Sequence, residues 1–401
     1  MNLLGQWQPA DARDHHTAPD FQIPPHQPLN LPGVHAYAKH SVAAGEGIDF
    51  HVSSTVPYEL SICRLGHKID DPDSVDILHT FERSKPKTHP IHMGSYVHVD
   101  KTLPADLQIK AFSLTCWVRP WRIEGRQGLM TQCDFDQACG WGLFIDEGGR
   151  AAFYLGDGRR YRESFMHAGP TLEQRRWHHV VGTFDGKTKR LWVDGRKAGQ
   201  WPISQAIVSG NASLRLAACG KNGLASMFLD GDLCMPAIFG RALTSAEVVN
   251  EYSRRGLEPT AGEDLLACWK FDEELGSVVT DLSGHERHGR IINKANWMIG
   301  GPSFLADRVE RYGDYRPFAD PKRGHGLRFA ADDLYDCRWP VAHSFQIPKD
   351  AKSGIYVGRF RFDLDGKPML YHVTFIVRKA QKKPKAPLLV LAATSTWLAY
   401  N

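Results

Sequence analysis

The sequence predicts a mostly β chain, in which a β-sandwich or jelly roll is inserted into a small β domain. Three observations support this fold class. Apolar and polar residues alternate in many short runs, as at Ile48, Phe50 and Val52. Asp-Gly turns separate several of these runs. Similar strand patterns also flank a long central region, whose many short strands predict a separate domain.

Length, net charge and the distribution of apolar residues further limit the kinds of protein that this chain can be. A chain of 401 residues is longer than a domain with a single hydrophobic core usually is, so we expect two or three domains. The net charge of +4 is small, and no dense basic stretch accompanies a nucleic-acid-binding motif, so we expect no nucleic-acid partner. No apolar run has the length of a membrane span, and the N-terminus lacks a signal-peptide core. We therefore expect a cytoplasmic protein, whose eight scattered cysteines are mostly buried thiols.

The small β domain is predicted in two parts. Residues 1–32, rich in Pro and His, are expected to form a tail that lies on another surface or stays mobile. Residues 33–90 form the first part, with two strands followed by a polar connection. Residues 299–378 form the second part, in which one face is shared by Tyr371, Val373, Phe375 and Val377.

Residues 91–298 form the predicted sandwich. Phe112, Leu114, Cys116 and Val118 alternate with more polar residues, and WHHVVGTFDGKTKRLWVDGRKAG contains two strands with Asp-Gly turns. Because this region is self-contained, we expect its flanks, residues 33–66 and 343–378, to pack together as one β domain.

One helix is predicted within this region, near residues 245–254. Thr244 can cap its N-terminus, and Glu247, three residues later, completes a capping box. Gly256 lies just past its end. We expect this helix to decorate the surface of the sandwich.

The C-terminal part has a different character. Residues 379–387 form a basic, Pro-containing linker, and residues 388–401 are expected to start an α/β catalytic domain. The continuous apolar run at 388–393 is typical of a strand covered on both faces in a parallel sheet. Its partner strands would lie in residues that this chain lacks or in another chain. The alternative is a last strand added to the preceding β domain.

Several side chains are candidate ligands for a metal ion or a sugar. The histidine pairs favour structural roles, since adjacent histidines on a strand point to opposite faces and the last pair has no carboxylate partner pattern. Asp230 and Asp232 could hold calcium, but a structural turn is the favoured interpretation. The tryptophans could stack on sugars, although their alternation favours core positions. The histidine pairs are His15-His16, His178-His179 and His285/His288, and the tryptophans are Trp117, Trp121, Trp141, Trp177, Trp192 and Trp201.

Two resemblances extend this interpretation. WHHVVGTFDG…LWVDG, LDGDLCMPAIFGRALTSAEV and LLACWKFDEELGSVVTDLSGHERHG are similar to the laminin-G/concanavalin A-like sandwich family. GEGIDFHVSSTVPYELSICRLG, AKSGIYVGRFRFDLDGKPMLYHVTFIVR and TSTWLAYN resemble the large (beta) subunit of the N,N-dimethylformamidase family. The second resemblance implies that the chain is the N-terminal scaffold portion of an iron-dependent amidohydrolase, which hydrolyses small N-substituted amides and is inactive as this chain alone. The alternative is a non-catalytic, lectin-like module for carbohydrate binding or subunit assembly.

The family resemblance also implies a metal site. It suggests ferric iron (Fe3+) held by two tyrosines and one glutamate, of which only Tyr400, in TWLAYN, matches a position here. Tyr400 follows the apolar run, and ligand sites in α/β sheets lie beyond the carboxyl ends of strands. The remaining ligands are expected outside this chain, no catalytic residue is assigned, and no organic cofactor is expected. The implied partners are a small accessory subunit, the rest of the catalytic domain and further copies of the complex.

Overall fold

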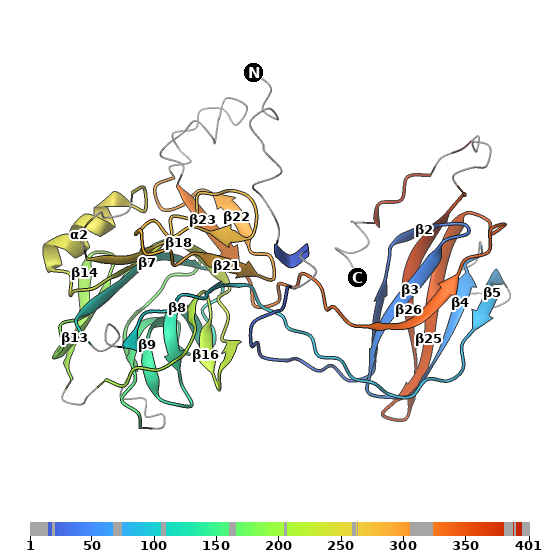
Figure 1. Ribbon diagram of the computed structural model, residues 1–401, viewed down its shortest axis with the longest axis horizontal. Coiled ribbons are helices and arrows are strands. Elements are labelled where there is room, and N and C mark those ends of the chain that lie inside the picture. The colour runs from blue at the N-terminus through green and yellow to red at the C-terminus, as the bar shows by residue number, and fades with distance from the viewer. Residues whose placement is uncertain are drawn as a thin grey trace, which may run out of the picture. The chain divides into compact units, whose positions relative to one another are not determined.

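The computed structural model divides the chain into two compact units of β structure (Figure 1). Unit 1 comprises residues 1–27 and 92–336, and unit 2 comprises residues 28–91 and 337–401. No described helix is long and apolar enough to cross a membrane. The residues that the structure describes are 15–17, 21–66, 74–105, 110–159, 166–203, 207–258, 262, 264–304, 324–380, 388 and 390–394.

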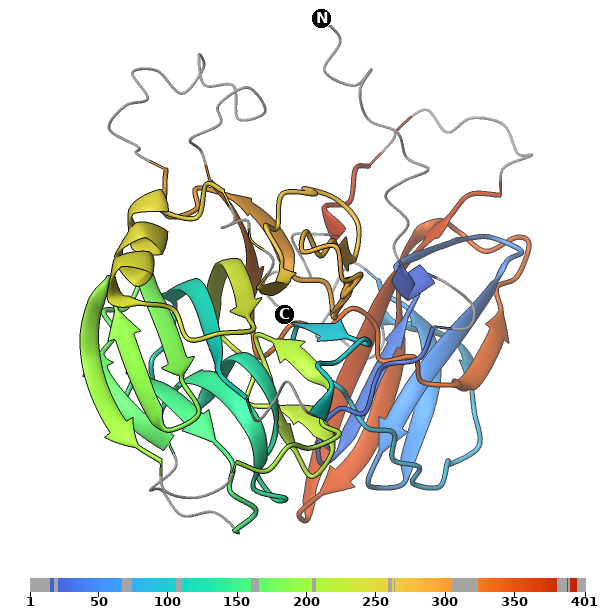
Figure 2. The same cartoon turned by 60° about the vertical axis from the view of Figure 1, so that its left-hand side comes forward.

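Unit 1 is a sandwich of two eight-stranded sheets (Figure 2). The first sheet has the order β11 (Met166–Thr171), β10 (Arg150–Leu155), β9 (Cys139–Ile145), β8 (Gln127–Asp134), β15 (Leu214–Leu216), β6 (Tyr96–Val99), β21 (Gly289–Ile292) and β20 (Val278–Val279). The second sheet has the order β14 (Arg196–Pro202), β13 (Thr188–Val193), β12 (His178–Phe184), β7 (Phe112–Pro120), β18 (Gly231–Phe239), β23 (His325–Phe329) and β22 (Asn296–Ile299), with β19 (Leu265–Cys268) also paired to β18. A two-stranded ribbon adds β16 (Cys219–Lys221) and β17 (Leu224–Ser226), and one 3-10 turn, η2, spans His15–Thr17.

The inner faces of the two sheets share one hydrophobic core. The predicted inward residues of β7 are all buried, which confirms their alternation. Ser113, Thr115 and Trp117, on the other face of β7, are buried as well. A second cluster, including Trp117, Trp192 and Val248, covers that face. The central strand of this sheet is therefore covered on both faces, which a half-buried pattern does not predict.

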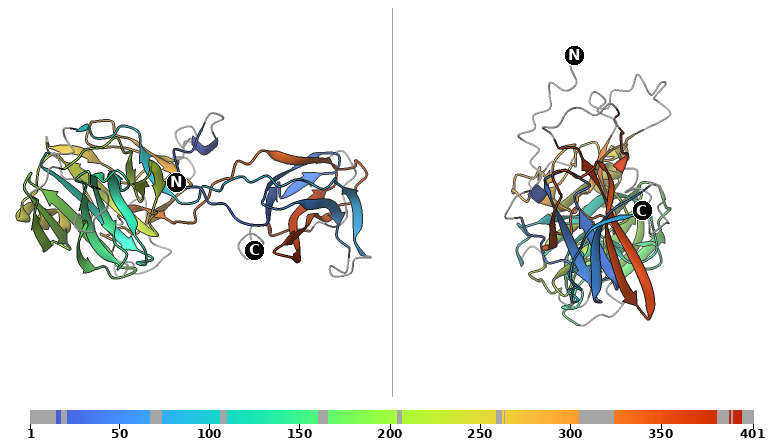
Figure 3. Two further views of the ribbon diagram at one scale, coloured as in Figure 1. Left: turned by 90° about the horizontal axis from the view of Figure 1, so that it is seen from below. Right: turned by 90° about the vertical axis from the view of Figure 1, so that its right-hand side faces the viewer.

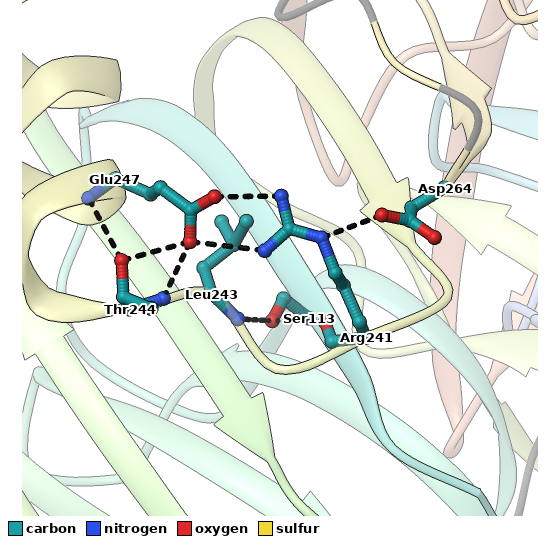
Figure 4. A network of polar contacts seen from close by, with 6 residues as sticks. All are labelled: Ser113, Arg241, Leu243, Thr244, Glu247 and Asp264. Atoms are coloured by element: carbon teal, nitrogen blue, oxygen red, sulfur yellow. Dashed lines mark hydrogen bonds and ion pairs between the residues drawn. The ribbon is translucent and has the colours of Figure 1, made fainter.

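The predicted helix is α2 (Ser245–Arg254), and its capping box is confirmed (Figure 4). The Thr244 hydroxyl accepts a hydrogen bond from the Glu247 amide at 3.3 Å, and the Glu247 carboxylate accepts one from the Thr244 amide at 2.7 Å. Arg241 binds the same carboxylate at 2.6 Å and Asp264 at 2.6 Å. This network ties the helix start to the loops that precede β19 and follow β18.

Unit 2 contains two smaller sheets. One has the order β1 (Val34–Ala38), β3 (Gly47–Ser54) and β24 (Val341–Gln346), and the other has the order β2 (Ser41–Ala43), β26 (Lys367–Arg378), β25 (Gly354–Leu364), β4 (Tyr58–Arg64) and β5 (Asp76–Thr80). β3 pairs with β24, and β4 pairs with β25, so residues from both ends of the chain share each sheet. Figure 3 shows these blue and red strands side by side. The expected packing of residues 33–66 against 343–378 is confirmed.

The structure corrects two local expectations. The stretch expected to be a polar connection contains strand β5, which pairs with β4. The second part of the small β domain does not begin at residue 299, because β23 pairs with β18 of the sandwich and unit 1 continues to Asp336. The described residues of the apolar run at 388–393 form no strand, and the expected α/β domain stays a prediction because its partner strands are expected outside this chain. β23 and β18 are distant in sequence, so local alternation could not indicate that they pair.

Candidate functional site

The predicted metal ligand Tyr400 lies outside the described residues. In the part of the preceding segment that is described, Leu388, Val390 and Leu391 are 83%, 88% and 94% exposed. Among the described residues of this chain, no layer of side chains covers these exposed residues as the layers on both faces of a buried parallel strand would. No described strand pairs with them. The metal site therefore stays a prediction.

The two central histidines engage different partners. His178 Nδ1 lies 2.9 Å from Asp194 Oδ2, whereas His179 Nε2 lies 2.8 Å from Thr115 Oγ1. His179 is fully buried, and this burial lowers its pKa to about 3. Each ring thus has its own hydrogen-bonding role in the packing of β12.

The other histidine pairs also have structural contacts. His16 Nε2 accepts a hydrogen bond from the Asn293 amide at 3.2 Å and stacks on Tyr335. His288 Nδ1 accepts one from the Asp281 amide at 3.1 Å. Across the described ranges, no group of three or more His, Cys, Asp or Glu side chains could hold a metal ion.

Asp230 and Asp232 bind nitrogen donors. Buried Asp232 accepts hydrogen bonds from Arg119 at 2.7 Å, from Trp121 at 2.8 Å and from Arg328 at 2.8 Å. Asp230 accepts hydrogen bonds from an arginine side chain at 2.5 Å and from a backbone amide at 2.6 Å. These carboxylates neutralise guanidinium groups, which supports the structural interpretation of this turn.

The six candidate tryptophans differ in burial, and Trp177 and Trp201 are half-buried. Trp141, Trp117 and Trp192 are buried, in agreement with core positions. Trp121 is 36% exposed, and the guanidinium of Arg328 lies over its ring at 4.3 Å. A tryptophan that is exposed and flanked by cations is a surface feature, which the alternation along the strand did not predict.

A pair of adjoining hollows, which we call the Tyr252 groove, lies near these residues. The hollows have volumes of about 500 Å³ and 660 Å³ and share Arg176 and Tyr252 in their walls. One is lined by Trp117, Glu173, Gln174, Arg175, Arg176, Trp177, Tyr252, Ser253 and Arg255, and the other by Pro170, Arg176, Val193, Asp194, Arg196, Lys197, Ala198 and Tyr252.

Three segments, 170–177, 193–198 and 252–255, build this groove together with Trp117 of β7, and special backbone positions shape it. Arg175, in the loop before β12, has a φ of 64°, and Arg255, the C-cap of α2, has a φ of 51°. Gly195 has a φ of 74° in the turn between β13 and β14, and a Cβ there would lie 3.1 Å from the Tyr252 ring. Gly195 therefore allows the turn to approach the last turn of α2 closely.

Sequence reasoning missed this site. The available signal was the cluster of cations in RRW at 175–177 and in SRR at 253–255. Neither cluster is unusual by itself, because exposed arginines are common at helix ends and in loops. The fold brings them together around Tyr252.

Comparison with known families defines the class of the central region. Residues 93–249 match the family model of the Concanavalin A-like lectin/glucanases superfamily, so the predicted concanavalin-like sandwich is confirmed. Residues 310–401 match the family model "N,N-dimethylformamidase beta subunit-like, C-terminal".

The particular resemblance expected from the sequence is confirmed as well. The chain is similar to the N,N-dimethylformamidase beta subunit of Paracoccus aminophilus, with 28% identity over 403 residues that cover 90% of this chain and 51% of that protein. The N,N-dimethylformamidase beta subunit of an Alcaligenes species is 27% identical, again over 90% of this chain and 51% of that protein. The chain thus spans about half the length of these curated relatives.

Solved structures with a related arrangement are more distant. A sialidase CBM40 module of Ruminococcus gnavus bound to alpha2,3 sialyllactose is 12% identical, with a TM-score of 0.34 over 41% of this chain and 96% of that chain. The heptameric SAP-like pentraxin of Limulus polyphemus is 12% identical, with a TM-score of 0.36 over 58% of this chain and 94% of that chain.

Proposed function

We propose that this chain is the N-terminal scaffold portion of an amidohydrolase large subunit, which acts on small N-substituted amides such as N,N-dimethylformamide. The observation that carries this proposal is the similarity to two N,N-dimethylformamidase beta subunits over 90% of the chain. It extends across both units, because the C-terminal family match begins at residue 310 in unit 1 and continues through residues 337–401 of unit 2.

Ferric iron is the proposed cofactor, with Tyr400 as one ligand. Phenolate and carboxylate oxygens suit a hard trivalent cation, which would act as a Lewis acid toward the amide. The described residues hold no cluster of three His, Cys, Asp or Glu side chains that could replace such a set. The proposed site consists of Tyr400 together with ligands from outside this chain, and we derive no catalytic step from the described residues.

The proposed complex has further members. The relatives are named as beta subunits, so an accessory subunit and the remaining part of the catalytic domain are the proposed partners. In this arrangement the sandwich would serve assembly. The competing function, carbohydrate binding by the sandwich, predicts specific retention on a glycan array, which subunit assembly does not.

The test is metal analysis of the assembled complex beside an assay of N,N-dimethylformamide hydrolysis. Tyr400→Phe deletes only the phenol oxygen, so we expect loss of iron, of tyrosinate-to-iron absorption and of activity, with the fold retained. Tyr371→Phe is the matched control, because its hydroxyl donates to the Ala36 carbonyl at 3.0 Å and has a structural role. Full iron occupancy and activity in Tyr400→Phe would refute the assignment.

A further inference from the structure

The Tyr252 groove has more positive than negative charge. Five of its lining side chains are cationic and two are carboxylates. Both carboxylates already have partners, since Glu173 pairs with Arg176 at 2.8 Å and Asp194 lies 2.9 Å from His178. The carboxylates that line the groove therefore leave most of its positive charge without a negative partner.

The remaining cations have no carboxylate partner among the described residues. Arg175 and Arg196 are exposed. Arg255 donates to the Pro302 carbonyl at 2.8 Å, and Lys197 lies 3.3 Å from a glutamine oxygen. Neutral oxygens orient these two side chains without cancelling their charge. The groove thus offers cations without carboxylate partners in both hollows that share Tyr252.

Aromatic surface lies between these cations. Tyr252 is 37% exposed, and its ring stacks on buried Trp117 with a centroid distance of 5.5 Å. Trp177 is half-buried, with the Arg119 guanidinium 5.0 Å from its ring centroid. Tyrosine, tryptophan and arginine are the residues that most often dominate protein–protein binding energies.

We propose that the Tyr252 groove binds an acidic polypeptide segment of a partner subunit. The proposal rests on the proposed function, because that function supplies the partner subunit. Acidic side chains of an extended segment would reach the cations in both hollows, while an apolar side chain would cover the Tyr252 ring. The combined hollows, about 500 Å³ and 660 Å³, have room for several residues, which a single small anion would not need.

Fluorescence anisotropy with labelled synthetic peptides tests the proposal. The probe is a Glu- and Asp-rich peptide of about ten residues with one central Leu, since each extended residue spans roughly 3.3 Å. We expect saturable binding that weakens strongly between about 0.05 M and 0.5 M salt. A peptide in which Lys replaces every acidic residue should not bind.

The test variant is Arg196→Glu combined with Lys197→Glu, because both residues are exposed and lie at the start of β14. Its affinity for the acidic peptide should fall about tenfold or more, since two attractions become repulsions. The control is Arg159→Glu, an exposed arginine outside both hollows, which should bind nearly as the parent does. Tyr252→Ser, with an unchanged circular dichroism spectrum, should also weaken binding if the ring is an anchor.

Unchanged affinity in the Arg196→Glu/Lys197→Glu variant would overturn the proposal. Tighter binding of a single-stranded oligonucleotide of equal charge, or of heparin, would overturn it in favour of a general polyanion site. The measurement needs neither iron nor amide hydrolysis. Failure of the groove is therefore distinguishable from failure of the proposed function, which Tyr400→Phe tests.

Discussion

The Tyr58 hydroxyl lies 2.8 Å from Nε2 of His343, although 285 residues separate the two side chains in the sequence. Tyr58 begins β4 and His343 lies on β24, so the contact joins the two sheets of unit 2. Burial raises the pKa of Tyr58 and lowers that of His343. The two groups therefore form a hydrogen bond in which neither side chain is charged. The contact requires that residues before and after the sandwich in the sequence pack together.

Tyr58→Phe should lower the free energy of unfolding of unit 2 by about 1 kcal/mol, because His343 loses a partly buried hydrogen-bond partner. Urea unfolding of Tyr58→Phe, His343→Leu and the double variant gives the coupling energy. Simple additivity of the two single changes would show that the contact contributes nothing to stability.

Thr244→Ala should destabilise unit 1 by about 1 kcal/mol, since the Glu247 amide loses its capping oxygen. Thr244→Ser keeps that oxygen and is the matched control. Thermal unfolding followed by circular dichroism measures both variants. Equal melting temperatures for Thr244→Ala and the parent would contradict the capping role.

Unit 1 should lose stability as the pH falls below about 6.5, the ordinary pKa of histidine. Burial lowers the pKa of His179 to about 3, so in this window the unfolded chain binds a proton that the folded chain does not. The stability is thus present at high pH and is lost on acidification, by roughly 2 to 3 kcal/mol between about pH 6.5 and 4.5.

His179→Gln should reduce this pH dependence, as measured by urea unfolding at several pH values. His285→Gln, at an exposed position, is the control and should leave the dependence unchanged. Burial also lowers the pKa values of His26 and His98 to about 4, so these histidines contribute in the same direction. The difference between variant and parent is therefore the informative quantity. Parallel curves for parent and His179→Gln would contradict the role of His179.

Native protein should have one rapidly reacting thiol. Seven of the eight cysteines are buried, and only Cys337 is partly exposed. Burial also raises the pKa of Cys268 to about 12, so the reactive thiolate is scarce. Titration with a chromogenic disulfide should show one fast thiol before denaturation and eight afterwards.

Cys337→Ser should abolish the fast phase of that titration. A total below eight in denaturant would contradict the expectation of free thiols. The pair to inspect first by mass spectrometry is Cys133 and Cys219, whose sulfur atoms lie 3.7 Å apart.

Local sequence patterns predicted several strands and the helix of this fold. The alternation at Ile48, Phe50 and Val52 predicted a strand whose three side chains are buried, and Thr244 with Glu247 predicted the start of α2. These predictions succeed because strand alternation and helix capping depend on residues within a few positions of one another. The resemblance of the flanks to the N,N-dimethylformamidase beta subunit was also visible in the sequence and is confirmed.

Tertiary structure decided the relationships between distant segments. β23 joins the sandwich because β18 offers it an edge, and β7 is buried on both faces because α2 and its neighbours cover it. Tyr252 meets Arg175 and Arg196 in one groove only through the packing of α2 against the sheet. Charged residues have no periodicity that indicates their neighbours, and strand pairing depends on which edges and apolar faces remain to be covered. Strand pairing and the neighbours of charged residues are therefore determined only when the whole chain folds and buries its apolar surface.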